Sequence, residues 1–209
     1  MERVSIEEAK KIYGENFIGV DELLPLFNKM GWVYENVDIP EIPYSAQILE
    51  KCSHDYILIL GIPNINGKQL TIKSFRDVFG INPEASEPCF YNQDWYLSEE
   101  FINKTLELKW YLLKKNVIEE SRAVQPKELQ QKNITFPSAI LCTYTFFAYY
   151  FAKGELLWYH DFVWCIDIDH NGDRIYVGKY HDIDGINKNG FSIHRHLALR
   201  NCYASISTI

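Results

Sequence analysis

The sequence lacks the features that mark secreted, membrane-spanning and disulfide-rich proteins. Its five cysteines are widely spaced and odd in number, and no Cys-x-x-Cys pair indicates a zinc ribbon or a disulfide framework. The N-terminal stretch MERVSIEEAKKIYG has no apolar core of the kind that a secretory signal needs. The longest apolar run, residues 139–152, is shorter than the roughly twenty residues of a spanning helix. We therefore expect a soluble cytoplasmic protein without a membrane partner.

Basic charge is also scarce. The chain has 21 lysines and arginines against 28 acidic residues, a formal net charge of −7. Nucleic-acid-binding proteins instead concentrate positive charge in patches that attract the phosphate backbone. Nucleic acid is therefore not expected as the main partner.

The common catalytic motifs are missing too. There is no Gly-x-Ser-x-Gly elbow, no glycine-rich loop for phosphates and no Gly-x-Gly-x-x-Gly fingerprint. The frequent hydrolase, NTPase and dinucleotide-binding classes thus gain no support. No cofactor is predicted, and a divalent metal is only a weak alternative.

What is present predicts a single α+β domain over residues 1–209, with 119–135 as the one place where it could divide. Ser5, Asp21, Ser45 and Thr71 are predicted to begin short helices in the N-terminal part, and Ser98 gives a further helix signal. The apolar segment DYILILGIP predicts a central strand of a mixed or antiparallel sheet. One buried aromatic helix is expected at about 138–153. A β-rich C-terminal part should follow, with a hairpin at 161–181.

The segment IDIDHNGDRIY within that hairpin resembles the first half of a calcium loop. Asp167, Asp169, Asn171 and Gly172 match its positions 1, 3, 5 and 6, but position 12 is Gly178 instead of the required glutamate. The flanking residues alternate in polarity as strands do. A hairpin with a two-residue Asn-Gly turn is therefore the preferred interpretation.

This turn predicts a register in which Asp169 pairs with Arg174. Asp167, Asp169, Arg174 and Tyr176 would then form a polar face, and the neighbouring isoleucines and valine an apolar one. Extended to the strand bases, the same register places Asp161 opposite Asp182. Paired carboxylates can share a proton or hold a metal. The candidate catalytic residues are therefore His160, Asp161, His181 and Asp182.

A second candidate is the segment His194-Arg195-His196, which would put both imidazoles on one side of a strand. Together with Asp182 they could bind a divalent metal. Surface histidines without any ligand, or histidines that are part of an aromatic cluster, are the alternatives.

Paired aromatic residues are the third unusual feature. Trp95 and Tyr96 have Asp94 and Glu99 as near neighbours, and Trp110 follows in a predicted strand. Tyrosine and tryptophan combine a large apolar body with one polar tip, which suits pocket walls and interfaces as well as cores. These five residues are the candidate ligand-binding group.

The motifs DWYLSEEF from residue 94, GE at 154 and DIDHNGDRIYVG from residue 167 resemble a family of uncharacterised bacterial proteins. The similarity covers roughly residues 90–180. It implies a shared fold and a bacterial, intracellular setting, and it brings no activity with it. The ending NGFSIHRHLALRNCYAS is also faintly similar to the last strands of C-type-lectin-like domains.

Three functions follow as expectations. The first is a non-catalytic binding or interaction module with an aromatic-lined surface, which would take a small molecule or a protein partner and could form a homo-oligomer. The second is a metal-assisted or acid-base hydrolase that uses the histidines and aspartates of the C-terminal region. The third is a C-type-lectin-like binding domain.

Overall fold

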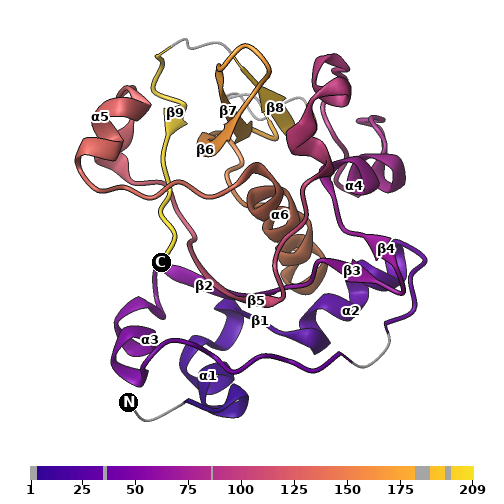
Figure 1. Ribbon diagram of the computed structural model, residues 1–209, viewed down its shortest axis with the longest axis vertical. Helices are drawn as coiled ribbons and strands as arrows, with labels where there is room; N and C mark the ends of the chain where they lie inside the picture. Colours follow the sequence, from indigo (N-terminus) through magenta and orange to yellow (C-terminus); the bar gives the residue numbers. More distant parts are fainter. Residues whose placement is uncertain (1–3, 35–36, 86, 182–188, 196–198) are drawn as a thin grey trace.

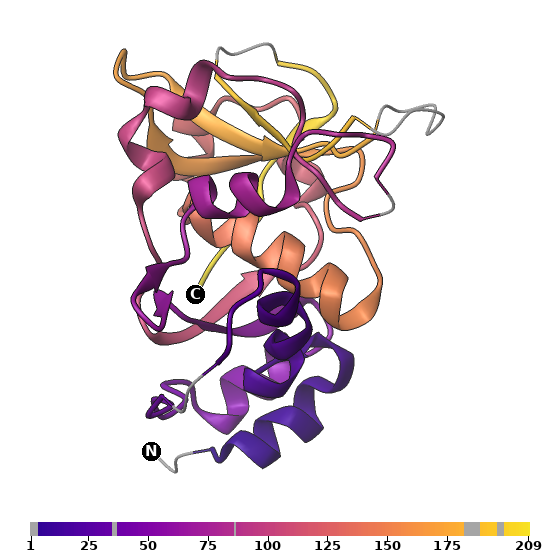
Figure 2. The same cartoon turned by 90° about the vertical axis from the view of Figure 1, so that its right-hand side faces the viewer.

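The computed structural model describes residues 4–34, 37–85, 87–181, 189–195 and 199–209. It has an α+β fold with two larger sheets, a long helix between them and a small two-stranded sheet (Figures 1 and 2). No helix in these ranges combines the length and the apolar character that crossing a membrane requires.

The N-terminal helices begin where the capping residues predict. The Ser5 hydroxyl accepts the amide of Glu8 at the start of α1, and Ser45 and Thr71 cap α3 and α4 in the same way. Only α2 starts earlier than expected, directly after Gly19. The helices are α1 (Ile6–Tyr13), α2 (Val20–Lys29), α3 (Ala46–Cys52) and α4 (Ile72–Phe79), with one 3-10 turn, η1 (Gly14–Asn16).

The first sheet has the strand order β1-β2-β5, and its central strand is the apolar segment predicted for that place. β2 (Tyr56–Gly61) runs parallel to β1 (Phe17–Ile18) and antiparallel to β5 (Lys109–Lys114). The Asn66-Gly67 turn joins a separate small hairpin, β3 (Asn64–Ile65) and β4 (Lys68–Gln69). The mixed sheet that the sequence predicted is thus confirmed.

Residues 95–103 form two 3-10 turns instead of the α-helix that Ser98 predicts. They are η2 (Trp95–Ser98) and η3 (Glu100–Asn103), and Glu99 separates them with an extended backbone. Because the chain bends at Glu99, its carboxylate lies buried against the C-terminal hairpin.

The buried aromatic helix, α6 (Ala139–Lys153), is confirmed. Ser138 caps its first turn, and Gly154 ends it in the left-handed conformation. α6 contacts α2, α4 and β1 on one side and β6 and β7 on the other. It is therefore the central element that separates the two sheets (Figure 1).

The second sheet has the order β8-β7-β6-β9 and contains the predicted hairpin. β6 (Phe162–Ile168) is antiparallel to β7 (Arg174–Gly178) and parallel to β9 (Tyr203–Ala204), and β8 (Ser192–His194) extends the sheet beyond β7. We call the side toward α6 the inner face and the opposite side the outer face.

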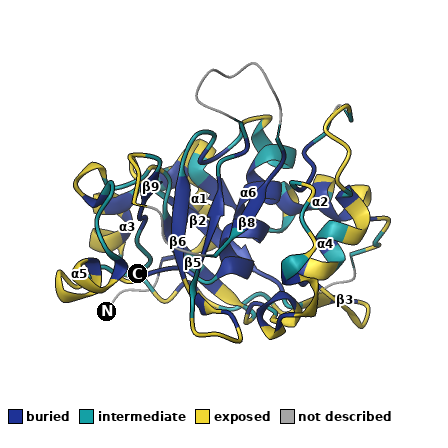
Figure 3. Cartoon of the chain, turned by 90° about the horizontal axis from the view of Figure 1, so that it is seen from above, coloured by how far each residue is buried: buried dark blue, intermediate teal, exposed yellow. Residues whose placement is uncertain are grey.

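Both faces of this sheet are apolar near its centre. Val163, Cys165, Ile175 and Val177 on the inner face belong to the main core, which also holds residues of the first sheet. A second cluster on the outer face joins Leu129 and Phe136 to strand residues, namely Phe162, Trp164, Tyr176 and Tyr203. Figure 3 shows the buried sheet and α6 flanked by the more exposed α4 and α5.

The segment 119–135 covers part of the outer face. It holds η4 (Glu119–Ser121) and the short helix α5 (Pro126–Gln131), whose Leu129 is buried in the outer cluster. The polar stretch that suggested a boundary in the sequence is thus packed against the C-terminal sheet.

Candidate functional site

The hairpin has a different register from the one its Asn-Gly turn predicts. Trp164 pairs with Tyr176, a bulge follows, and Ile168 pairs with Arg174. The turn is held by Asp169, whose carboxylate accepts the amides of Asn171 and Asp173. An aspartate that bonds to the following backbone amides favours a longer loop than a two-residue turn. The predicted pairing of Asp169 with Arg174 is therefore wrong.

The observed register also changes the predicted faces. Asp167 and Asp169 are 3% and 5% exposed, whereas Ile166 and Ile168 are 57% and 56% exposed. Because Ile168 pairs with Arg174 and not with the next residue of β7, the β6 side chains are exchanged between the two faces relative to those of β7. The two aspartates therefore lie on the inner face with the buried apolar residues of β7, and the two isoleucines are open to solvent.

The buried carboxylate of Asp167 is fully satisfied. One oxygen accepts the amide of Ala139, the first residue of α6, at 2.7 Å, and the other lies 2.7 Å from the ammonium of Lys104. An anion at a helix N-terminus is stabilised by the free amides and the helix dipole. Asp167 therefore fastens the hairpin to the central helix.

A second charged group lies at the hairpin tip, where the buried carboxylates of Glu99 and Asp169 meet Arg195 and the exposed His170. Arg195 Nη1 lies 2.8 Å from Asp169 and 3.8 Å from Glu99, while His170 contacts Glu99 through its amide at 3.0 Å and its Nδ1 at 2.6 Å. Burial alone would raise the pKa of Asp169, but the bonds from Arg195 and two backbone amides hold it below its usual value.

Glu99, Asp169 and His170 are the only three side chains that could share a metal ion in the part of the chain that the structure describes. The guanidinium of Arg195 already supplies a cation to both carboxylates. We therefore interpret the group as an ion-pair network that fixes the hairpin tip against η2 and η3.

Among the described residues, His160, Asp161 and His181 of the predicted catalytic group do not form a set of side chains that could share a metal ion. Asp161 forms a bidentate ion pair with Arg122, with N–O distances of 2.6 and 3.3 Å. The backbone carbonyl of Asp161 accepts the amide of Lys179. His160 and His181 each lie against the ring of Tyr159. Asp182 lies outside the described residues.

The predicted metal group is not assembled either, because Asp182 and His196 both lie outside the described residues. His194 is half-buried on the outer face, stacked on Tyr176, with its Nδ1 3.5 Å from Gln93. Burial, with a smaller contribution from Lys179, lowers the pKa of His194 to about 4. The imidazole is therefore uncharged at neutral pH.

The predicted ligand-binding residues divide between two places. Arg76 bonds to both Asp94 and the buried Tyr96 hydroxyl. Trp95 lies under Arg195 and so belongs to the hairpin-tip network. Trp110 is 2% exposed in the first sheet, where its indole donates to the Pro40 carbonyl. Trp110 therefore shares no cleft with Trp95.

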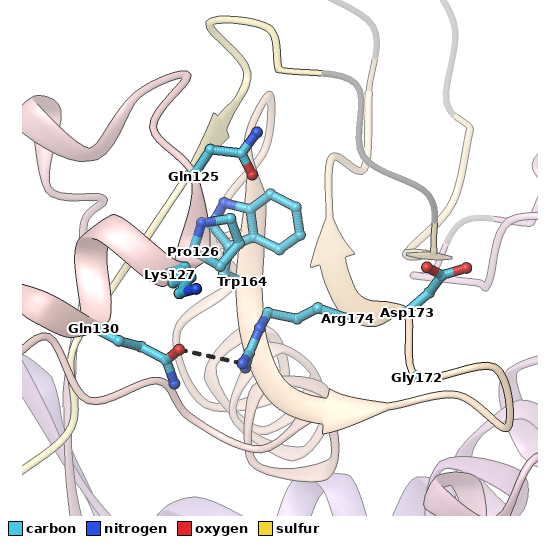
Figure 4. Close-up of a pocket in the computed structure, with 8 residues that line it drawn as sticks. All are labelled: Gln125, Pro126, Lys127, Gln130, Trp164, Gly172, Asp173 and Arg174. Atoms are coloured by element: carbon cyan, nitrogen blue, oxygen red, sulfur yellow. Dashed lines mark hydrogen bonds between the residues drawn. The ribbon is translucent and has the colours of Figure 1, made fainter.

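A pocket outside the predicted sites lies between α5 and the hairpin, on the outer face (Figure 4). We call it the α5 pocket. Its volume is about 480 Å³, in the range of small-molecule sites. Eight residues line it: Gln125, Pro126, Lys127, Gln130, Trp164, Gly172, Asp173 and Arg174.

Arg174 is the unusual member of the α5 pocket. Its guanidinium is half-buried, yet its contacts are to neutral groups: the Cys165 carbonyl at 2.9 Å, the Gln130 amide oxygen at 3.5 Å and the ring of Phe136. Within the described chain it has no ion pair with a carboxylate. Burial accordingly lowers the pKa of Arg174, whereas Glu119 and Asp161 raise that of Arg122.

Trp164 carries a buried hydrogen-bond donor without a described partner. The side chain is 1% exposed, and its indole N–H has no hydrogen-bond partner among the described residues. A buried donor without an acceptor costs about 1 to 3 kcal/mol. The α5 pocket thus combines a cation without an anion and a donor without an acceptor.

Little in the sequence indicates the α5 pocket. Its lining comes from a polar segment and from a hairpin some forty residues later, and the register predicted from the sequence pairs Arg174 with Asp169. Comparisons with family models, curated proteins and solved structures find no match, so the interpretation depends on this geometry.

Proposed function

We propose that this protein is a non-catalytic binding module and that the α5 pocket takes a small organic acid. The observation that carries the proposal is the half-buried guanidinium of Arg174, which has no carboxylate partner among the residues that the structure describes. A buried charge is costly unless it is paired. A bound carboxylate would supply the missing anion.

The donor geometry fits a carboxylate. The guanidinium of Arg174 has five N–H donors, and it forms two hydrogen bonds, both to neutral oxygens. A planar guanidinium binds a carboxylate through two parallel hydrogen bonds. Lys127 adds a second positive charge to the lining, and Figure 4 shows the carboxylate of Asp173 pointing away from the Arg174 guanidinium.

The apolar part of the lining indicates what else the ligand should have. Pro126 and the ring of Trp164 lie together in the α5 pocket (Figure 4). They would pack against an apolar, preferably flat, body attached to the acid group. Small aromatic carboxylates combine both features.

The lining also fits binding better than bond making. The eight described residues offer amide, guanidinium and ammonium donors and one carboxylate, that of Asp173, and none is a histidine, serine or cysteine. General acid-base and nucleophilic catalysis most often use a histidine, serine or cysteine, and the Asp173 carboxylate points away from Arg174 (Figure 4).

Calorimetric titration with benzoate and with benzamide tests the proposal, because the two differ in charge and little in shape. We expect benzoate, or a larger aromatic carboxylate in the same series, to bind at least tenfold more tightly than its amide. Equal binding of acids and amides, or no binding across the series, would contradict the proposal.

Two pairs of variants locate the site. Arg174→Met should weaken binding of the acid about ten- to a hundredfold, since charge-assisted hydrogen bonds contribute about 1.5 to 3 kcal/mol, while Arg174→Lys should weaken it less. Lys127→Gln should also weaken binding. Lys132→Gln, on an exposed lysine just after α5 and outside the lining, is the matched control and should change nothing.

A further inference from the structure

A second pocket lies against the first sheet, between α1, α2 and β1. We call it the α1 pocket. Its volume is about 330 Å³, and it shares no lining residue with the α5 pocket, which lies on the other sheet. The α1 pocket is therefore a separate site, built from the N-terminal part of the chain and one residue of β5.

Most of the uncharged lining of the α1 pocket is apolar. Phe17 and Trp110 are each 2% exposed, and their ring centres lie 5.4 Å apart, so the two rings are fixed in the core. Ile6 is 38% exposed and leaves apolar surface in contact with water. The apolar side chains that line the pocket are Ile6, Phe17, Val20, Ile39 and Trp110. An apolar ligand body could remove part of this surface from water.

Three carboxylates and one ammonium line the same pocket, and one of the carboxylates is fully paired. Glu22 Oε1 lies 2.7 Å from Lys10 Nζ, and Glu22 Oε2 accepts the amide of Gly19 at 3.0 Å. Burial alone would raise the pKa of Glu22, but these two bonds hold it below its usual value. Lys10 and Glu22 therefore balance each other in charge.

The other two carboxylates, of Glu7 and Asp21, lack a close cation. Within the described ranges Glu7 has no ion pair, and Asp21 lies 3.9 Å from the Lys10 ammonium, which is too far for a hydrogen bond. Both residues belong to the first turn of a helix, where the helix dipole favours the ionised carboxylate. The lining has three acidic residues and one lysine, so it carries two negative charges that no described cation balances.

Lys10 shows how this pocket accommodates an ammonium group. Its Nζ pairs with Glu22 and lies 5.9 Å from the centre of the Phe17 ring. An ammonium beside a carboxylate and an aromatic ring gains from both contacts. The protein thus already places one cation of its own at the pocket, and two carboxylates are left for another.

We infer that the α1 pocket binds a small organic cation, namely a primary ammonium group attached to an apolar body. Glu7 and Asp21 would accept hydrogen bonds from the ammonium, and Ile6, Val20 and Ile39 would contact the apolar body. The negative potential of the lining disfavours an anion. A neutral ligand would gain nothing from the two carboxylates.

Calorimetric titration with 2-phenylethylamine and 2-phenylethanol tests this inference, because at pH 7 the amine is charged, the alcohol is neutral, and the two differ little in shape. At constant ionic strength we expect the amine to bind about tenfold more tightly, as a charge-assisted hydrogen bond predicts. The trimethylammonium analogue of the amine has no N–H donor and should bind more weakly than the amine. Equal binding of amine and alcohol, no binding of the amine, or tighter binding of the trimethyl compound would overturn the inference.

Substitutions in the lining should change the affinity for the amine in opposite directions. Glu7→Gln and Asp21→Asn, both at exposed positions, should each weaken binding about threefold. Lys10→Met should strengthen binding, because it removes a like charge and leaves Glu22 without its cation. Glu15→Gln is the matched control: it changes the net charge by the same amount at an exposed residue outside the lining, and it should have no effect.

The variants also separate the α1 pocket from the α5 pocket. Arg174→Met should leave the affinity for the amine unchanged, so the result of the benzoate titration does not bear on this inference. Circular dichroism verifies that each variant is folded. Amine binding that persists in a Glu7→Gln, Asp21→Asn double variant, or that weakens equally in Glu15→Gln, would contradict the assignment.

Discussion

The two faces of the C-terminal sheet differ in how they accommodate charge. On the inner face, Asp167 is buried and has both a cation and a helix amide as partners. On the outer face, Arg174 is half-buried among neutral groups, and the buried indole N–H of Trp164 beside it has no acceptor among the described residues. The buried charge of the inner face is paired within the protein, whereas the Arg174 guanidinium on the outer face could pair with an external anion.

This difference between the two faces shows that burial of a charge does not by itself indicate a ligand site. The hairpin-tip network contains two buried carboxylates, yet Arg195 compensates them within the protein. On the outer face, by contrast, no described carboxylate pairs with the Arg174 guanidinium. Four sets of substitutions test this difference between the two faces.

The largest effect is expected at Asp167. Asp167→Ala removes the partner of the Ala139 amide and of Lys104, and it should lower the free energy of unfolding by about 2 to 4 kcal/mol. Asp167→Asn keeps an acceptor for the amide and should cost roughly half as much. Urea unfolding at pH 7 measures both, and an unchanged Asp167→Ala protein would show that the inner face does not depend on this contact.

A smaller effect is expected from His194 on the outer face. Its pKa is about 4 when folded and 6.5 as the ordinary value. Between these pH values the unfolded chain binds a proton that the folded protein does not, so stability should decrease as the pH falls from about 6.5 to 4. The loss amounts to about 3 kcal/mol at most, at roughly 1.4 kcal/mol per pKa unit.

His194→Phe should remove this part of the pH dependence, as urea unfolding between pH 4 and 7 can show. His54→Gln, at an exposed histidine, should not. The same slope in wild type and His194→Phe would mean that the imidazole titrates normally.

A still smaller change is expected at Arg174 without ligand. Arg174→Met removes a desolvated charge together with its contact to Phe136, and these effects oppose each other. The free energy of unfolding should stay within about 1 kcal/mol of wild type. A loss of several kcal/mol would show that Arg174 is a structural residue.

The smallest effect is expected at the exposed isoleucines. Ile166→Thr and Ile168→Thr should each change stability by less than about 0.5 kcal/mol, because both side chains are already in water. Ile175→Thr, on the buried face, is the control and should cost about 2 kcal/mol or more. A cost as large at Ile166 or Ile168 as at Ile175 would favour the register predicted from the sequence, in which all three isoleucines lie on one face.

The sequence predicted those parts of the fold that depend on local signals. Ser5, Ser45, Thr71 and Ser138 cap helices where expected, and the apolar strand at β2 is central. These features need only neighbouring residues or a continuous apolar run. The hairpin is likewise predicted by a local signal, the Asn-Gly turn between two segments of alternating polarity.

The register and the candidate site could not be predicted, because they depend on distant contacts. Asp169 bonds to Arg195, and Asp167 to Lys104, across many residues of sequence. These contacts favour burial of the aspartates over that of the isoleucines. The α5 pocket likewise requires the packing of α5 on the sheet, which no local pattern indicates.

The contact between Asp167 and Ala139 also restricts which sequences can replace this one. Proline is ordinarily welcome at the first position of a helix, since the amide it lacks would have no partner there. In α6 that amide is the donor to Asp167. Proline at position 139 should therefore be excluded as long as an aspartate occupies 167, so that the two positions would have to change together in any redesigned or recombined chain.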